Sequence, residues 1–359
     1  MPDERRAAAR MPHARRILVI APNWLGDAVM ALPAIADVRR HHAAAHLTVA
    51  ARTSVVPMFE LAGGLDQMIT LQWKGGLLDR AGVAADTAAL RAGSFDVAVL
   101  LPNSFASAWL ARQAGVPERW GYARDARSWL LTRPVAAPGG SRHQAAYYQH
   151  LTREFGAPAG PLEPRLTAAA ADLESARAGL AARGWTGMRP LVALAPGAAY
   201  GTAKRWLPAH YARLVSELVT AHGATCVLVG GGVDASAARE VYETAAAGAR
   251  PHIIDLAGAT PLRMLAGVLS LARACVSNDS GAMHVAAALG TRVVALFGPT
   301  RDKETAPLGH ASHPATVLIH DVWCRPCMLR ECPIDHRCMA GLQPARVLTA
   351  VVDAVERSA

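Results

Sequence analysis

The chain has 359 residues and a net charge of +9, and 52% of its residues are hydrophobic, 18% charged and 5% aromatic. This length accommodates two domains with separate cores. No apolar run reaches the roughly 20 residues that a membrane-spanning helix needs, which excludes a membrane-spanning protein. No signal-peptide pattern is present either, so we expect a cytoplasmic protein. The positive charge favours phosphorylated small molecules, nucleic acid or an anionic membrane as partners, although no nucleic-acid-binding signature accompanies it.

The first part of the chain alternates short apolar runs with segments of helical periodicity. Alternation of this kind predicts a parallel sheet with helices on both faces. The predicted strands are residues 16–21, 47–50, 68–71 and 95–101, and the predicted helices are 27–40, 55–61, 79–91 and 105–114. Residues 134–164 are rich in Pro and Gly around a short helix at 143–155, which is typical of a join between domains.

A second alternating series follows this join. Its predicted strands are residues 191–194, 226–229, 253–256, 274–276 and 293–297, and its predicted helices are 208–221, 235–246, 261–271 and 282–289. The two series predict an α/β protein with two Rossmann-like halves. Ligands of such sheets bind beyond the carboxyl ends of the strands. We expect a disordered tail at 1–14, domains at 15–165 and 166–343, and a C-terminal helix at 344–359.

The most informative segment is SNDSGAMHVAAALGTRVVALFGPT, residues 277–300. Its strand ends in NDSG and turns directly into a helix, so free backbone N–H groups lie at the positive end of that helix and predict a phosphate site. Asp279 and His284 lie beside these donors, where they could hold a sugar. In the alternative interpretation, Asp279 or Ser280 only caps the helix.

Two further strand ends carry candidate catalytic residues. After the first strand, NWLGD places Gly26 at a tight turn and Asp27 at the start of the first helix, where a carboxylate could accept a proton from a bound hydroxyl or simply cap the helix. In the second half, PGAAYGTAKRW presents Lys204 and Arg205, which could neutralise a diphosphate leaving group or remain solvated.

A glycine run at residues 230–232 precedes Asp234 and suits a phosphate or ribose loop, although the full dinucleotide fingerprint is missing. The loops also lack Asp-x-Asp pairs, which argues against catalysis by a divalent metal.

Four cysteines gather near the C-terminus with the spacing C-x2-C-x4-C-x5-C. In a reducing cytoplasm this spacing predicts either a structural zinc site or a set of free thiols. We interpret Cys226 and Cys275 as core residues, because each lies within an apolar strand. The clustered residues are Cys324, Cys327, Cys332 and Cys338.

In their order and spacing these loops resemble the ADP-heptose:lipopolysaccharide heptosyltransferase family of inverting GT-B glycosyltransferases. The resemblance extends from RILVIAPNWLGDAVMALPAI through PGAAYGTAKRWLP and residues 277–300 to the tail WCRPCMLRECPIDHRCM. The AKRW loop and the tail are most similar to the members that add the second core heptose. This resemblance implies two Rossmann-like domains facing a central cleft, with the acceptor in the first domain and ADP-heptose in the second.

Carried over motif by motif, the resemblance also implies roles for individual residues. The implied catalytic residues are Asp27 as general base and Lys204 as the cation that neutralises the diphosphate. The implied ADP-heptose contacts are Gly26, Gly197, Lys204, Asp234, Asp279, Ser280, Gly281, Ala282 and His284.

The resemblance implies no required cofactor. It implies a phosphorylated lipid A core as acceptor and peripheral contact with the inner leaflet of the membrane. Alternatives are transfer to the first core position or to another acceptor, a nicotinamide-dependent oxidoreductase, and a zinc-bearing nucleic-acid-binding module.

Overall fold

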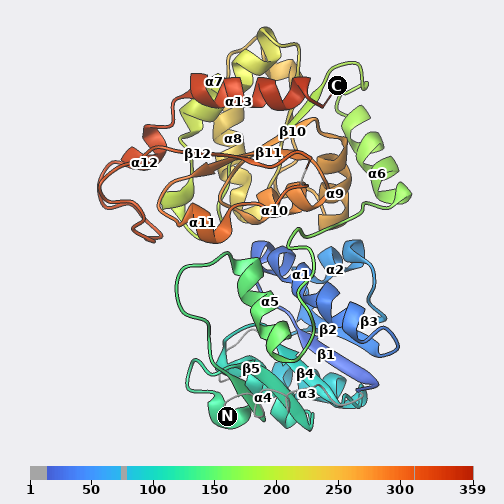
Figure 1. Cartoon of the computed structure of the whole chain (residues 1–359). Coiled ribbons are helices and arrows are strands. Elements are labelled where there is room, and N and C mark those ends of the chain that lie inside the picture. Colours follow the sequence, from blue (N-terminus) through green and yellow to red (C-terminus); the bar gives the residue numbers. More distant parts are fainter. Residues whose placement is uncertain (1–13, 74–78, 311, 359) are drawn as a thin grey trace. The chain divides into compact units, whose positions relative to one another are not determined.

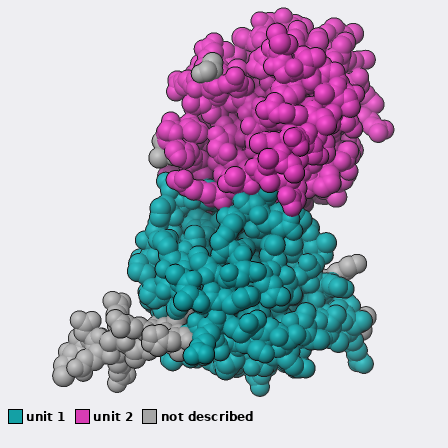
Figure 2. All heavy atoms as spheres, turned by 90° about the vertical axis from the view of Figure 1, so that its right-hand side faces the viewer, with its two compact units in different colours: residues 1–164 teal, residues 165–359 magenta. Residues whose placement is uncertain are grey.

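The computed structural model describes residues 14–73, 79–310 and 312–358. The chain divides into two compact units, Met1–Pro164 and Arg165–Ala359 (Figures 1 and 2). The predicted tail at residues 1–14 lies outside the described residues except for its last position. Within the described ranges, no helix is both long enough and apolar enough to cross a membrane.

The first unit is a six-stranded parallel sheet with the order β3-β2-β1-β4-β5-β6. Its central strands are continuous apolar runs because helices cover both faces of the sheet. The strands are β1 (Arg16–Ile20), β2 (His46–Arg52), β3 (Gln67–Leu71), β4 (Val97–Leu100), β5 (Glu118–Tyr122) and β6 (Arg133–Val135). The helices are α1 (Leu25–His41), α2 (Val56–Ala62), α3 (Arg80–Ala92), α4 (Phe105–Gln113) and α5 (Gln144–Glu154), with a 3-10 turn η1 (Ser128–Leu130).

The second unit repeats this topology with the order β12-β11-β10-β7-β8-β9, again all parallel. Its strands are β7 (Leu191–Ala195), β8 (Thr225–Leu228), β9 (Ile253–Asp255), β10 (Ala274–Asn278), β11 (Arg292–Phe297) and β12 (Thr316–Ile319). Its helices are α6 (Ala170–Ala181), α7 (Pro208–Thr220), α8 (Ala235–Thr244), α9 (Leu262–Leu271), α10 (Gly281–Ala288), α11 (Asp302–Thr305), α12 (Arg337–Ala340) and α13 (Pro344–Glu356), with 3-10 turns η2 (Thr202–Lys204), η3 (Gly232–Asp234) and η4 (Arg250–His252).

Both units have the Rossmann strand order, in which the direction of winding reverses beside the first strand of each sheet. In the second unit this switch point lies between β7 and β10. Ser277 of β10 pairs with Ala195 of β7, so the two strands end at the same level and their following loops start side by side. Ligands of doubly wound sheets bind at such a point.

The alternation predicted from the sequence is confirmed in both units, but six helices and strands were missed: α6, the four-residue helices α11 and α12, and the strands β5, β6 and β12. The strands β5 and β6 begin with charged residues, and β6 is a three-residue edge strand that contains Pro134, so neither shows an apolar run. The segment interpreted as a join contributes β6 and α5 to the first unit, where α5 packs against α1 (Figure 1).

The contact between α6 and α9 generates a prediction about stability. A methyl group on Gly267 of α9 would lie 2.3 Å from the carbonyl oxygen of Asp172 on α6. We expect Gly267→Ala to lower the free energy of unfolding by about 1–3 kcal/mol, because the helices must separate. Urea denaturation followed by circular dichroism measures this loss. The matched control is Gly248→Ala, whose methyl group would have no atom within 4 Å, and equal stability of the two variants would contradict the prediction.

Candidate functional site

A buried asparagine joins the two loops at the switch point of the second unit. The side-chain amide of Asn278 donates to the carbonyl oxygens of Pro196 (2.7 Å) and Gly197 (3.2 Å). Its oxygen accepts from the backbone N–H of Trp206 (3.0 Å) and from the hydroxyl of Tyr211 (3.1 Å). Asn278 is fully buried and uses both donor and acceptor, so it holds the loop after β7 against the end of β10.

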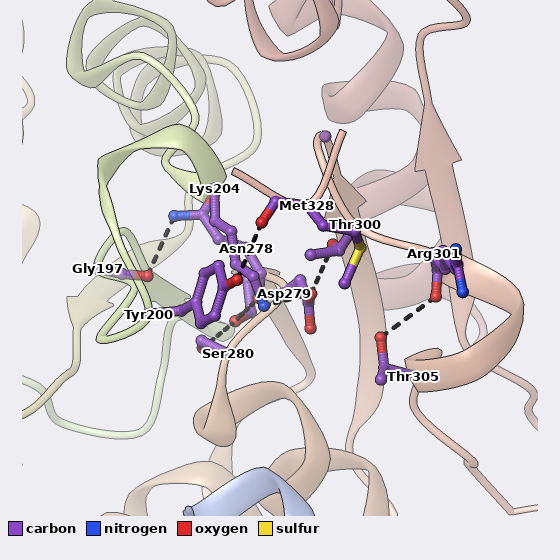
Figure 3. A network of polar contacts seen from close by, with 12 residues as sticks. Gly197, Tyr200, Lys204, Asn278, Asp279, Ser280, Thr300, Arg301, Thr305 and Met328 are labelled. Carbon is purple, nitrogen blue, oxygen red and sulfur yellow. Dashed lines mark hydrogen bonds and ion pairs between the residues drawn. The ribbon is translucent and has the colours of Figure 1, made fainter. Parts of the chain in front are cut away.

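An ion pair connects the same two loops. The Nζ of Lys204 lies 2.7 Å from Oδ2 of Asp279, and the two side chains are only 13% and 7% exposed (Figure 3). The hydroxyl of Thr300, beyond the end of β11, donates to the same oxygen at 2.7 Å. Two donors therefore hold the Asp279 carboxylate, and the Lys204 ammonium is fixed beside the start of α10.

The first turn of α10 is suited to binding an anion. Ser280 is the N-cap residue in extended conformation, but its side chain makes no capping hydrogen bond and lies 3.0 Å from the hydroxyl of Ser277 instead. The interpretation that Ser280 caps the helix is therefore wrong. Gly281 and Ala282 are half-buried and follow at the positive end of the helix, where backbone N–H groups lack intrahelical partners. His284 is buried one turn further along.

Asp234 packs against the ends of β7 and β8 through two glycines. A methyl group on Gly197 would lie 2.0 Å from Oδ1 of Asp234, and one on Gly230 would lie 2.8 Å from its Cβ. The other oxygen of Asp234 accepts from the N–H of Gly231 at 3.0 Å. In the part of the chain that the structure describes, Oδ1 is buried without a hydrogen-bond partner.

In the first unit, Asp27 is half-buried in the first turn of α1, directly after Gly26. The N-cap position is Trp24 rather than Asp27, and its side chain makes no capping hydrogen bond. The hydroxyl of Tyr148 on α5 donates to Oδ1 of Asp27 at 3.4 Å. Burial, and secondarily the charge of Asp27, raises the pKa of Tyr148 well above its usual value, so its hydroxyl stays protonated as a donor.

The clustered cysteines differ in exposure. Cys338 is buried and burial raises its pKa, Cys324 and Cys332 are half-buried, and Cys327 is exposed. Over the described ranges, no three His, Cys, Asp or Glu residues are placed to hold a metal ion. The structural zinc therefore stays a prediction.

The interpretation of Cys226 and Cys275 as core residues is confirmed. Both are fully buried, and burial raises the pKa of each thiol to about 12.

The structure thus brings Lys204, Asp279, Ser280 and Gly281 together at one switch point. Three residues to which sequence reasoning gave no role also belong to this arrangement, and all three stood within quoted motifs: Asn278, Thr300 and Tyr200. In the first unit, Tyr148 was missed as well, and it stood in no quoted motif.

Comparison with known proteins places the chain among glycosyltransferases. The family model described as glycosyltransferase family 9 (heptosyltransferase) matches residues 84–337. Lipooligosaccharide heptosyltransferase 2 of Haemophilus ducreyi is 32% identical over 304 residues, which cover 82% of this chain and 86% of that relative. Lipopolysaccharide heptosyltransferase 2 of Escherichia coli K12 is 31% identical over 306 residues, with the same coverage.

Solved structures agree with this assignment. The E. coli structure described as ADP-heptose lps heptosyltransferase II has a TM-score of 0.82 and 28% identity, covering 95% of this chain and 99% of that one. A family 9 glycosyl transferase from Veillonella parvula shares the fold with a TM-score of 0.82 at 20% identity. The expected GT-B class with two Rossmann-like domains is confirmed, and the chain belongs to glycosyltransferase family 9, the heptosyltransferases.

Proposed function

We propose that the chain transfers L-glycero-D-manno-heptose from ADP-heptose to a heptose-Kdo2-lipid A acceptor, adding the second heptose of the lipopolysaccharide inner core. Several similar relatives are named heptosyltransferase 2 of lipopolysaccharide or lipooligosaccharide. Lipopolysaccharide heptosyltransferase 1 of Pseudomonas aeruginosa is also similar, with 28% identity over 330 residues. Transfer to the first core position is therefore the second candidate, and it differs only in the acceptor.

One observation carries the proposal: the Lys204 to Asp279 ion pair at the start of α10. ADP leaves with its negative charge on the diphosphate, so the site must offer fixed positive charge where that charge develops. The Lys204 ammonium and the backbone N–H groups of Gly281 and Ala282 offer part of it, since Asp279 offsets the charge of Lys204. In this proposal they take the place of the divalent metal that other glycosyl transfers use.

The remaining donor contacts follow from the same geometry. The unpaired oxygen of Asp234 accepts a hydrogen bond from a ribose hydroxyl, beside the close approach at Gly197. Asp279 and His284 lie next to the anion site, where they orient the heptose. No cofactor enters this scheme.

In the first unit, Asp27 acts as the general base. Its carboxylate takes the proton from the acceptor heptose hydroxyl as that oxygen attacks the anomeric carbon of the donor. A single displacement of this kind inverts the configuration at that carbon. The Tyr148 hydroxyl orients the carboxylate through its hydrogen bond.

The acceptor is a phosphorylated glycolipid, so the reaction takes place at a membrane surface. The net charge of +9 suits peripheral attraction to the anionic inner leaflet at its cytoplasmic side. Family membership favours this transfer over the oxidoreductase and the nucleic-acid-binding module considered from the sequence.

The direct test is turnover of purified protein with ADP-heptose and either heptose-Kdo2-lipid A or Kdo2-lipid A. We expect ADP release with the first acceptor and little with the second. Release only with Kdo2-lipid A would favour the first core position instead, and no release with either acceptor would reject both candidates.

Replacing the proposed base tests the mechanism. We expect Asp27→Asn to lower kcat by about 100-fold to 10,000-fold, because the amide cannot accept the hydroxyl proton. ADP affinity should stay unchanged, since the diphosphate and ribose contacts proposed above belong to the second unit. A coupled ADP-release assay and calorimetric titration with ADP measure the two quantities. Tyr148→Phe is the matched variant, which keeps the base and loses only an orienting hydrogen bond, and full activity in Asp27→Asn would remove Asp27 from the mechanism.

Replacing the proposed leaving-group cation tests the donor site. We expect Lys204→Met to lower kcat by about 100-fold to 1,000-fold, because positive charge is lost where the diphosphate departs. Lys303→Met serves as the control, since this exposed lysine lies on α11, whereas the Asp279 carboxylate is held by Lys204 and Thr300. Equal turnover in the two variants would show that Lys204 is not needed. Thermal melting checks that Lys204→Met remains folded.

A further inference from the structure

The cysteine-rich segment, residues 323–338, lies directly on the loop that carries Lys204. The backbone N–H of Ala203 donates to the carbonyl oxygen of Arg330 at 2.9 Å. The hydroxyl of Tyr200 donates to the carbonyl oxygen of Met328 at 3.0 Å (Figure 3). A methyl group on Gly201 would lie 2.3 Å from the Arg330 carbonyl oxygen, so glycine is required for this approach. The segment is therefore part of the wall of the donor site.

The same segment is anchored to the loop after β11. The Arg325 guanidinium, 8% exposed, donates to the carbonyl oxygens of Gly298 (2.7 Å) and Thr300 (3.4 Å) and pairs with Asp302 at 2.7 Å. The N–H of Met328 donates to a third carbonyl of that loop, that of Pro299, at 3.0 Å. The loop that carries Lys204 and the loop after β11 both bind the segment. Its residues 328–330 therefore have a defined position beside Lys204.

Two cations share one aromatic ring in this wall. The Nζ of Lys204 lies 4.7 Å from the centroid of the Tyr200 ring, and the guanidinium carbon of Arg330 lies 5.2 Å from it. Cations are attracted to the ring face, so Tyr200 keeps both near the same point. The Arg330 side chain is exposed, and in the part of the chain that the structure describes no salt bridge joins it to a carboxylate.

The charge balance of the site gives Arg330 a role. Lys204 is paired with Asp279, so that pair together carries no net charge. The end of α10 adds only about half of one positive charge. A diphosphate needs more compensation than this, and Arg330 offers a full charge with the forked geometry that suits phosphate oxygens.

We propose that Arg330, held in place by Tyr200, is a second cationic contact for the diphosphate of the sugar nucleotide. The cysteine-rich segment thus supplies a donor-binding residue to the site. This inference rests on the proposed function, because it assumes a nucleoside diphosphate donor. It also specifies that the contact recognises the diphosphate rather than the nucleoside.

Calorimetric titration of the full chain with ADP and with AMP tests the assignment. We expect Arg330→Gln to weaken ADP binding about fivefold, as loss of an exposed charge contact does, and to weaken AMP binding by less than about twofold, because AMP lacks the second phosphate. Arg337→Gln is the matched control: Arg337 lies in the same segment, over the Trp323 ring at 5.6 Å, and pairs with Asp335 at 3.0 Å. It should leave both affinities unchanged.

A ring replacement tests how Arg330 is positioned. Tyr200→Phe keeps the ring and should retain ADP affinity, whereas Tyr200→Leu should weaken it. In Tyr200→Leu, the further change Arg330→Gln should cost less than it does in the wild type, since the two residues act as one unit. Fully additive losses would reject the role of Tyr200.

The outcomes separate this inference from the proposed function. A wild-type chain that fails to bind ADP rejects the sugar-nucleotide function itself. A wild-type chain that binds ADP, with Arg330→Gln binding equally well or losing ADP and AMP to the same extent, rejects only the role of Arg330.

Discussion

The proposed donor site depends on a nearly buried ion pair between two loops that follow neighbouring strands. Lys204 and Asp279 are 75 positions apart in the sequence and meet because β7 and β10 end at the same level of the sheet. An ion pair removed from water is costly unless its geometry and remaining hydrogen bonds are satisfied. Thr300 supplies one such bond to Asp279, and Asn278 holds the two loops in register beneath the pair. The same constraint places a fixed ammonium group beside the positive end of α10.

Close backbone approach shapes the rest of this site. Gly197 leaves room for the carboxylate of Asp234, and Gly201 leaves room for the carbonyl of Arg330. In each case a side-chain methyl group would collide with an atom from another loop. The carboxyl edge of the second sheet is therefore assembled from four segments, those after β7, β8, β10 and β11, with the cysteine-rich segment closing one side. The cysteines thus belong to a segment that packs against the loop carrying Lys204.

Much of the fold was predictable because buried parallel strands leave a simple signal. Strands such as β1, β4 and β7 are covered on both faces and read as unbroken apolar runs between helical patterns. The edge and charged strands β5, β6 and β12 lack that signal, since they are shorter or partly exposed. Helix α6 was missed because it buries only three residues and has weak amphipathic character. Where burial is partial, the periodicity on which prediction depends becomes faint.

The sequence by itself determined the class of the protein and the loops worth searching. The carboxyl ends of the strands in a doubly wound sheet lie at one edge, so pattern alone could place NWLGD at this edge of the first sheet and AKRW and NDSG at that of the second. The order of these motifs along the chain indicated the heptosyltransferases. Only the tertiary structure decided which side chains meet. Asn278, Thr300 and the Tyr200 and Arg330 pair act through contacts between residues up to 130 positions apart, the separation of Tyr200 from Arg330. Such contacts are set by strand register and loop packing, and neither of these produces a periodic pattern in the sequence.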